Sequence, residues 1–247
     1  MRLEGKIAIV TGAGKGIGRE TALALASEGV TVVSVARTQA DLEETVKRIG
    51  EKGGKATALS RDLTVSEQVK SMVDTVVETY GRIDILVNNA GGYPKEIYQN
   101  IEQQAIKLWE WSEEQWDQII KTNLRIPFLC MKHIIPVMIR QKSGDIVSVS
   151  SRMGRIASQM GAYAVAKGGI ITMTKTAAIQ TQEYGIRVNA VAPGIVDTPG
   201  QRTYNHSVGQ DGVKMGSAAD VSKAILYLLR DAPPVMTGQS IDLFTTV

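Results

Sequence analysis

The feature of this 247-residue sequence that most constrains its fold is a regular alternation of short, apolar, β-branched runs with longer amphipathic segments. The expected strands are residues 6–11, 31–36, 55–63, 83–89, 145–150, 187–193 and 240–244. Parallel neighbours in a sheet need a crossover, and a helix usually supplies it. The alternation therefore predicts an α/β fold of the Rossmann type, in which a doubly wound, seven-stranded parallel sheet is flanked by helices. We expect a single domain over residues 1–247.

The residue content argues against several other classes of protein. A single cysteine, Cys130, allows neither an internal disulfide nor a Cys-based metal site, and two histidines are too few for a His-rich centre, so no metal is expected. The net charge of +3 comes from scattered Lys and Arg, which does not predict nucleic-acid binding. We expect no secretory signal, because the sequence starts with charged residues and runs into a strand-like segment, and no apolar run approaches the ~20 residues that cross a bilayer. We therefore expect a cytoplasmic protein that does not bind a membrane.

A glycine-rich turn, TGAGKGIG at residues 11–18, lies between the first expected strand and the first expected helix. Missing side chains let a pyrophosphate approach the backbone amides, and a helix N-terminus adds partial positive charge. A glycine-rich segment can also simply turn the chain. The strand before it and the helix after it are, however, the context that a dinucleotide site requires. The turn therefore predicts a dinucleotide site.

The end of the second expected strand bears on the choice of cofactor. An acidic residue there binds the ribose 2′-hydroxyl and favours NAD, but this sequence has Ala36 followed by Arg37 and Thr38. Lys15 in the glycine turn adds a second cation, and no carboxylate stands in the segment to repel a phosphate. The alternative is that Lys15 and Arg37 are solvated surface groups. We expect NADP(H).

Further motifs follow in order. They are Asp62 in RDL, NNAG at 88–91, Asn123 in KTNL, SVSS at 148–151, YAVAK at 163–167 and RVNAVAPGIVDTP at 187–199. Together with the glycine turn they resemble the short-chain dehydrogenase/reductase (SDR) family over nearly all of residues 3–242. The resemblance implies an oxidoreductase that transfers a hydride between a nicotinamide cofactor and a small-molecule ketone or secondary alcohol. It also implies a homo-oligomer, a tetramer or a dimer.

The resemblance also implies the roles of four catalytic residues. Tyr163 passes a proton to the carbonyl oxygen, and Lys167, one helical turn away, favours the phenolate and lowers the tyrosine pKa from near ~10. Asn123 orders a water, and a serine binds the substrate oxygen. Aligning SSRMG on the family motif indicates Ser151, whereas the usual spacing to the tyrosine would indicate Ser150. We choose Ser151.

The same resemblance implies a set of cofactor contacts. Asp62 is expected at the adenine, Asn89 at the adenosine ribose, and Lys167 also at the nicotinamide ribose. The full set is Gly12, Gly14, Lys15, Gly16, Ile17, Gly18, Arg37, Thr38, Asp62, Leu63, Asn89, Ala90, Gly91, Tyr163, Lys167, Pro193, Gly194, Val196 and Thr198.

Two segments depart from the family pattern. Residues 93–112 form a longer link than usual, and its aromatic side chains could cover an apolar substrate or a neighbouring subunit, or could pack on their own domain. Residues 200–217 are polar and glycine-rich, which predicts a lid loop. The candidate substrate residues are Arg152, Met153, Trp109 and Trp111. Arg152 and Arg155 could bind an anionic group of the substrate, or both could be surface groups or oligomer contacts.

The segment between these departures is expected to form one helix from Ser112 to about Lys142, irregular at Pro127 and Pro136. A capping box of Ser112 and Gln115 predicts its start.

Two other functions stay open. The chain could reduce a 3-oxoacyl thioester, which needs the same chemistry at the carbonyl. It could also be a non-catalytic protein that senses a dinucleotide. Such a sensor typically lacks the catalytic tyrosine or lysine, and this sequence has both Tyr163 and Lys167.

Overall fold

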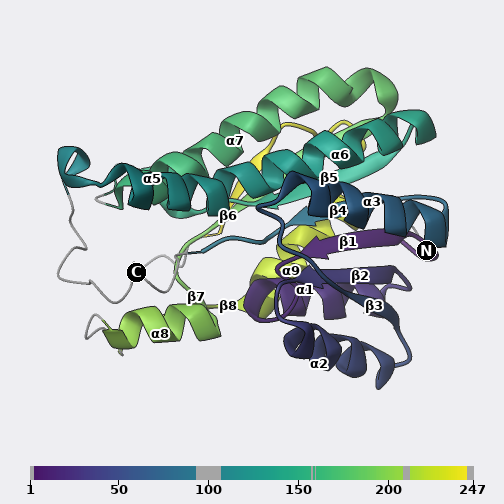
Figure 1. Ribbon diagram of the computed structural model, residues 1–247. Helices are drawn as coiled ribbons and strands as arrows, with labels where there is room; N and C mark the ends of the chain where they lie inside the picture. The colour runs from purple at the N-terminus through teal and green to yellow at the C-terminus, as the bar shows by residue number, and fades with distance from the viewer. Residues whose placement is uncertain (1–2, 93–106, 157, 159, 208–211, 244–247) are drawn as a thin grey trace.

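The computed structural model of the chain describes residues 3–92, 107–156, 158, 160–207 and 212–243 (Figure 1). Its main sheet has seven strands, all parallel, in the order β3-β2-β1-β4-β5-β6-β9. The strands are β1 (Ile7–Thr11), β2 (Thr31–Ala36), β3 (Lys55–Ser60), β4 (Ile85–Asn88), β5 (Gly144–Val149), β6 (Ile186–Pro193) and β9 (Ser240–Leu243). The predicted seven-stranded Rossmann-type fold is therefore confirmed.

Helices cover both faces of this sheet (Figure 1). One face packs against α1 (Gly16–Ser27), α2 (Gln39–Gly50) and α9 (Ala218–Leu226), and the other against α3 (Ser66–Tyr80), α6 (Ile126–Gln141) and α7 (Gly161–Thr181). Alternate residues of a strand point to opposite faces. In β1, Ile7 and Ile9 therefore join the core beneath α3, α6 and α7, while Ala8 and Val10 join the core beneath α1 and α9.

The strand order reverses between β1 and β4, which pair with Ala8 opposite Ile85 and Val10 opposite Val87. At such a reversal the loops that leave the two strands diverge, and ligands of open α/β sheets bind in the space between them. The glycine turn follows β1 and the NNAG motif ends β4, so the fold places both at this point. Because all seven strands are parallel, their carboxyl ends share one edge, on the left in Figure 1.

The segment from Ser112 to Lys142 is not one regular helix. The capping box forms as predicted, with Gln115 N donating to Ser112 Oγ at 3.1 Å and Ser112 N donating to Gln115 Oε1 at 3.4 Å, and α5 (Glu113–Ile120) begins there. A π-helical turn (Lys121–Arg125) follows, and α6 then stays helical across Pro136. The irregularity therefore lies in the π turn just before Pro127, and the irregularity predicted at Pro136 is not present.

The lid loop predicted for residues 200–217 is helical over its first part. Here α8 (Pro199–Ser207) directly follows Thr198, whose Oγ1 accepts from Gln201 N at 3.1 Å. A capping threonine followed by proline favours a helix start, which is why the loop prediction is wrong for these residues. At the other end of the segment, β8 (Gly216–Ser217) pairs with β7 (Val196–Asp197). Residues 208–211, and residues 93–106 of the longer link, lie outside the described residues.

None of the described helices is long and apolar enough to cross a membrane. Within the same residues, no group of His, Cys, Asp and Glu side chains has the arrangement of a metal site.

Candidate active site

The glycine turn packs so closely against Asn89 that side chains would not fit. Gly12 and Gly16 have φ angles of 66° and 54°, which favour glycine. A Cβ on Gly18 would lie 2.2 Å from the Gly12 carbonyl oxygen and 2.5 Å from Asn89 Nδ2. The first turn of α1 therefore starts directly against the end of β1. Its backbone N–H groups and the helix dipole suit the pyrophosphate of a dinucleotide.

Thr11, the last residue of β1, joins the two loops at the strand reversal. Its Oγ1 accepts hydrogen bonds from Asn89 N at 2.9 Å and Ala90 N at 3.0 Å, and donates to Val87 O at 3.2 Å. Asn89 Nδ2 in turn donates to Thr11 O at 3.0 Å and to Gly12 O at 3.3 Å. Sequence analysis did not single out Thr11. The only signal was a polar residue at the end of a strand that is otherwise wholly apolar.

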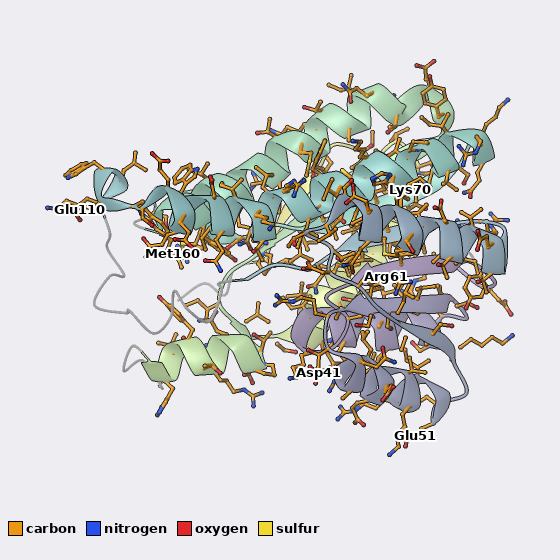
Figure 2. All side chains as sticks on the ribbon, viewed as in Figure 1. Asp41, Glu51, Arg61, Lys70, Glu110 and Met160 are labelled. Carbon is orange, nitrogen blue, oxygen red and sulfur yellow. The ribbon has the colours of Figure 1, made fainter. Side chains whose placement is uncertain are left out.

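The adenosine side of the candidate site contains a carboxylate that sequence analysis missed. Lys15 Nζ lies 3.0 Å from Asp41 Oδ2. Asp41 is in the first turn of α2 (Figure 2). A Cβ on Gly14 would lie only 2.9 Å from Asp41 Cβ, so this acid is packed against the glycine turn. The inference of two cations without a nearby carboxylate is therefore wrong in three dimensions. Asp41 lies past the end of β2, and only the folding of α2 onto the turn brings it there.

Asp62 is held in the loop that follows β3. Its Oδ1 accepts from Thr64 N at 2.9 Å and from Thr64 Oγ1 at 2.8 Å, while its own N–H donates to Gln68 at 2.8 Å. Partial burial acts to raise the Asp62 pKa, but the Thr64 hydrogen bonds, with the positive charges of Arg37 and Lys121, lower it below its usual value. Asp62 therefore stays ionised, with its orientation fixed, in the same part of the molecule as Arg37.

Lys167 is nearly fully buried, with only 4% of its surface exposed. Its Nζ donates to the carbonyl oxygen of Val149, at the end of β5, at 3.0 Å, and lies 5.6 Å from the centroid of the Tyr163 ring. Burial lowers the pKa of Lys167 to about 8. The structure therefore brings an ammonium next to a phenol at the carboxyl edge of the sheet. The ammonium belongs to a side chain of α7, and its hydrogen bond to Val149 O fixes it to β5.

Asn123, in the π turn, connects α5 with the loop after β4. Its Nδ2 donates to Gly92 O at 2.9 Å and to Ile119 O at 3.1 Å, and its Oδ1 accepts from Gly92 N at 2.8 Å. A Cβ on Gly91 would lie 2.9 Å from Asn123 Oδ1 and 3.6 Å from Lys167 Nζ. Asn123, Gly91 and Lys167 are therefore neighbours. A π turn often marks a functional site, and no sequence pattern indicated this one.

The two candidate serines have different hydrogen bonds. Ser150 Oγ donates to Lys167 O at 2.7 Å, whereas Ser151 Oγ accepts from Met153 N at 3.2 Å. A Cβ on Gly154 would lie 2.5 Å from Lys167 C, so the turn that follows Ser151 packs directly on the backbone of α7. Because the Ser150 hydroxyl already donates its hydrogen bond to the backbone of α7, the geometry favours Ser151 as the donor to a substrate oxygen. That role stays a prediction.

The segment after β6 reaches back to the glycine turn. Pro193 ends the strand, Gly194 N donates to Leu243 O at 3.0 Å, and Val196 is buried. A Cβ on Gly16 would lie 2.9 Å from Thr198 Cγ2. The segment after β6 therefore borders the glycine turn, and the cofactor contacts expected there stay a prediction.

The four candidate substrate residues differ in exposure and in contacts. Trp109 is 79% exposed, and Arg152 is also exposed, whereas the Trp111 ring lies against Gly161, two residues before Tyr163. Met153 is half-buried, and its sulfur accepts a hydrogen bond from Ser158. Arg155 Nε lies 2.8 Å from Asp242 Oδ1 on β9, and this pairing makes it a structural residue.

The family model for short chain dehydrogenases matches residues 6–209. The chain therefore belongs to the short chain dehydrogenase family, whose members are oxidoreductases that use NAD(P)(H).

Individual relatives are similar over almost the whole chain. A 3-oxoacyl-(acyl-carrier-protein) reductase of Thermotoga maritima is 38% identical over 251 residues, which cover 98% of each chain. Among solved structures, levodione reductase superposes with a TM-score of 0.88 at 26% identity, covering 97% of this chain and 96% of its own. A xylitol dehydrogenase with NAD⁺ bound superposes with a TM-score of 0.86 at 29% identity, covering 98% of each chain.

Proposed function

We propose that this chain is an NADP(H)-dependent oxidoreductase that interconverts ketones and secondary alcohols through Ser151, Tyr163, Lys167 and Asn123. The observation that carries the proposal is the buried Lys167 ammonium, 5.6 Å from the centroid of the Tyr163 ring and hydrogen-bonded to Val149 O. Burying an ammonium costs free energy, so its presence at this edge of the sheet calls for a functional reason.

The chemistry follows from the neighbouring groups. A bound nicotinamide would supply the hydride in reduction and accept it in oxidation. Tyr163 donates a proton to the carbonyl oxygen as the hydride reaches the carbon, so that ketone, hydride and proton give the alcohol. Lys167 as a cation stabilises the phenolate that remains, and the Ser151 hydroxyl donates a hydrogen bond to the same substrate oxygen.

The choice of NADP(H) rests on Arg37 and Lys15, with no acidic residue at Ala36. The arginine guanidinium and the lysine ammonium both suit a 2′-phosphate. The ion pair between Lys15 and Asp41 weakens the contribution of Lys15 and leaves Arg37 as the main determinant. A xylitol dehydrogenase of similar structure binds NAD⁺, so the binding of both cofactors has to be compared.

A homo-oligomer, a tetramer or a dimer, is part of the same proposal. Phe128 on α6 is 48% exposed, and Val165 and Ile179 on α7 are 51% and 78% exposed. Large apolar side chains that gather on one side of a fold favour association. A mass near 26.7 kDa in light scattering would contradict this part of the proposal. A cytoplasmic location stays the expectation drawn from composition.

A second candidate function is the reduction of a 3-oxoacyl thioester. It is favoured by the reductase of Thermotoga maritima, which is 38% identical to this chain and matches it from end to end. The catalytic groups would act in the same way on the 3-oxo group. The two candidate functions differ in whether the substrate carries a thioester next to the reacting ketone, so a comparison of substrates distinguishes them.

The test measures NADPH and NADH consumption against neutral ketones, anionic ketones and a 3-oxoacyl thioester. Tyr163→Phe should abolish turnover and leave NADPH affinity nearly unchanged. The matched control is Tyr227→Phe, since Tyr227 is 41% exposed and directly follows α9, which packs on the sheet face opposite α7. Fastest turnover of the thioester would establish the second candidate. Tight NADPH binding without turnover of any carbonyl would instead indicate a dinucleotide sensor.

A further inference from the structure

The start of α5, which leads to Asn123, lies against the start of α7, which carries Tyr163 and Lys167. Trp111 immediately precedes Ser112, the cap of α5, and Gly161 is the first residue of α7. A Cβ on Gly161 would lie 2.6 Å from Trp111 Nε1, 2.8 Å from Cε2 and 2.9 Å from Cζ2. The indole ring therefore rests directly on the backbone of Gly161. Met160, the residue before α7, lies beneath α5 in Figure 2, and α5 and α7 are in contact.

The contact is made at the least constrained part of α7. The first backbone N–H groups of a helix have no partner within it, so a first turn is held largely by what packs against it. Tyr163 lies in this turn, and its N–H donates to Met160 O at 3.0 Å. Gly161 has a φ of 39°, a left-handed conformation that glycine adopts at little cost. A side chain at this position would be strained and would also displace the indole.

The position of the Trp111 ring depends in turn on the start of α5, which it directly precedes. The capping box of Ser112 and Gln115 fixes the start of α5, and α5 leads into the π turn that contains Asn123. The indole N–H is buried and has no hydrogen-bond acceptor in the described part of the chain. A buried donor without a partner costs about 1–3 kcal/mol. Within the described residues, the ring is therefore placed by its shape and by packing, and not by a hydrogen bond.

From this geometry we infer that Trp111 is a positioning residue for Tyr163. Its indole packs on Gly161, fixes the first turn of α7 relative to α5, and so holds the phenol at its distance from Lys167. The inference rests on the proposed function, in which Tyr163 transfers the proton. It changes the expectation for Trp111, which acts through the backbone of α7 and not through contact with substrate.

The experiment compares Trp111→Ala, Trp111→Phe and Leu108→Ala in steady-state ketone reduction. A displacement of about 1 Å in a catalytic group can cost about 100-fold in rate. We expect Trp111→Ala to lower kcat by about 10- to 100-fold, with NADPH affinity and the KM for ketone changed less than about 3-fold. Trp111→Phe keeps an aromatic ring without the unpaired N–H and should recover most of kcat. Leu108→Ala is the matched control, because Leu108 lies in the preceding 3₁₀ turn and is 65% exposed.

A second measurement does not depend on turnover. The ionisation of Tyr163 is followed by ultraviolet difference titration against Tyr163→Phe, in the wild type and in each variant. A midpoint that moves in Trp111→Ala and returns in Trp111→Phe supports the inference even if no carbonyl is turned over and the proposed function fails. Equal kcat and equal midpoints in Trp111→Ala and Leu108→Ala would overturn it. An effect confined to the KM for ketone would also overturn it and make Trp111 a substrate contact.

Discussion

The Ser150 hydroxyl donates a 2.7 Å hydrogen bond to the backbone carbonyl oxygen of Lys167. This bond ties the end of β5 to α7 at the residue whose ammonium returns to β5 through Val149 O. Ser151, one position further on, accepts from Met153 N and keeps its own proton available for an acceptor in the site. The two neighbouring serines are therefore expected to differ in kind, one structural and one catalytic.

Replacing each serine by alanine separates these roles. Ser151→Ala removes a hydrogen-bond donor to the substrate oxygen, and we expect kcat/KM for ketone reduction to fall by about 100-fold or more. Ser150→Ala removes the tie between β5 and α7 and should destabilise the fold by about 1 kcal/mol with a smaller loss of activity. Steady-state kinetics and urea unfolding measure the two effects. The reverse ranking in kcat/KM would assign the catalytic role to Ser150.

The buried charge of Lys167 predicts a dependence of stability on pH. Its pKa falls from 10.5 to about 8 on folding, so the folded state carries the cost of a buried ammonium below pH 8 and loses that cost as pH rises toward 10.5. Lys167→Met carries no charge in either state. We expect it to be inactive but more stable than the wild type at pH 7, by on the order of 2 kcal/mol after the hydrogen bond to Val149 is lost.

Urea unfolding at several pH values measures this difference. The gain in Lys167→Met should be largest below pH 8 and should shrink steadily between pH 8 and 10.5. A gain that does not change with pH would mean that the ammonium is not desolvated in the folded state.

Cofactor choice is predicted to depend more on Arg37 than on Lys15. Lys15 is already paired with Asp41 at 3.0 Å, so its charge is partly compensated before any phosphate binds. Arg37→Ala should weaken NADPH binding by about 10-fold, which corresponds to one charge-assisted contact, and leave NADH binding unchanged. Asp41→Asn should strengthen NADPH binding by releasing Lys15. Titrations followed by the fluorescence of the reduced nicotinamide measure these affinities, and a wild type that binds NADH as tightly as NADPH would refute the assignment.

The close approach within the glycine turn predicts that Gly18→Ala loses cofactor binding. The added Cβ would lie 2.2 Å from Gly12 O, so the backbone would have to move. Such overpacking costs about 1–3 kcal/mol, and we expect NADPH affinity to fall by at least about 10-fold. Gly50→Ala is the matched control, because nothing lies within 4 Å of a Cβ at Gly50. Equal NADPH affinity in the two variants would place the pyrophosphate elsewhere.

The placement of Tyr163 beside Lys167 could be predicted because its signal is local. Tyr163 and Lys167 are four positions apart on one helix, and helical geometry alone puts them on one face. The π turn at Asn123 could not be predicted, since its hydrogen bonds go to Ile119 and to Gly92, thirty-one positions away. Nor could Asp41, which reaches Lys15 only because α2 folds back onto the glycine turn.

The sequence by itself determined the seven strands of the main sheet, their parallel arrangement with helical crossovers, and the positions of the glycine turn and the candidate catalytic motifs. Apolar runs, glycines and cap residues act over a few neighbouring positions, so their structural effect can be predicted from the sequence alone. Only the tertiary structure decided which serine is bound to α7, which acid faces Lys15, and that the Trp111 ring rests on Gly161. These contacts depend on the packing of distant segments to within an ångström, and no local pattern encodes that distance.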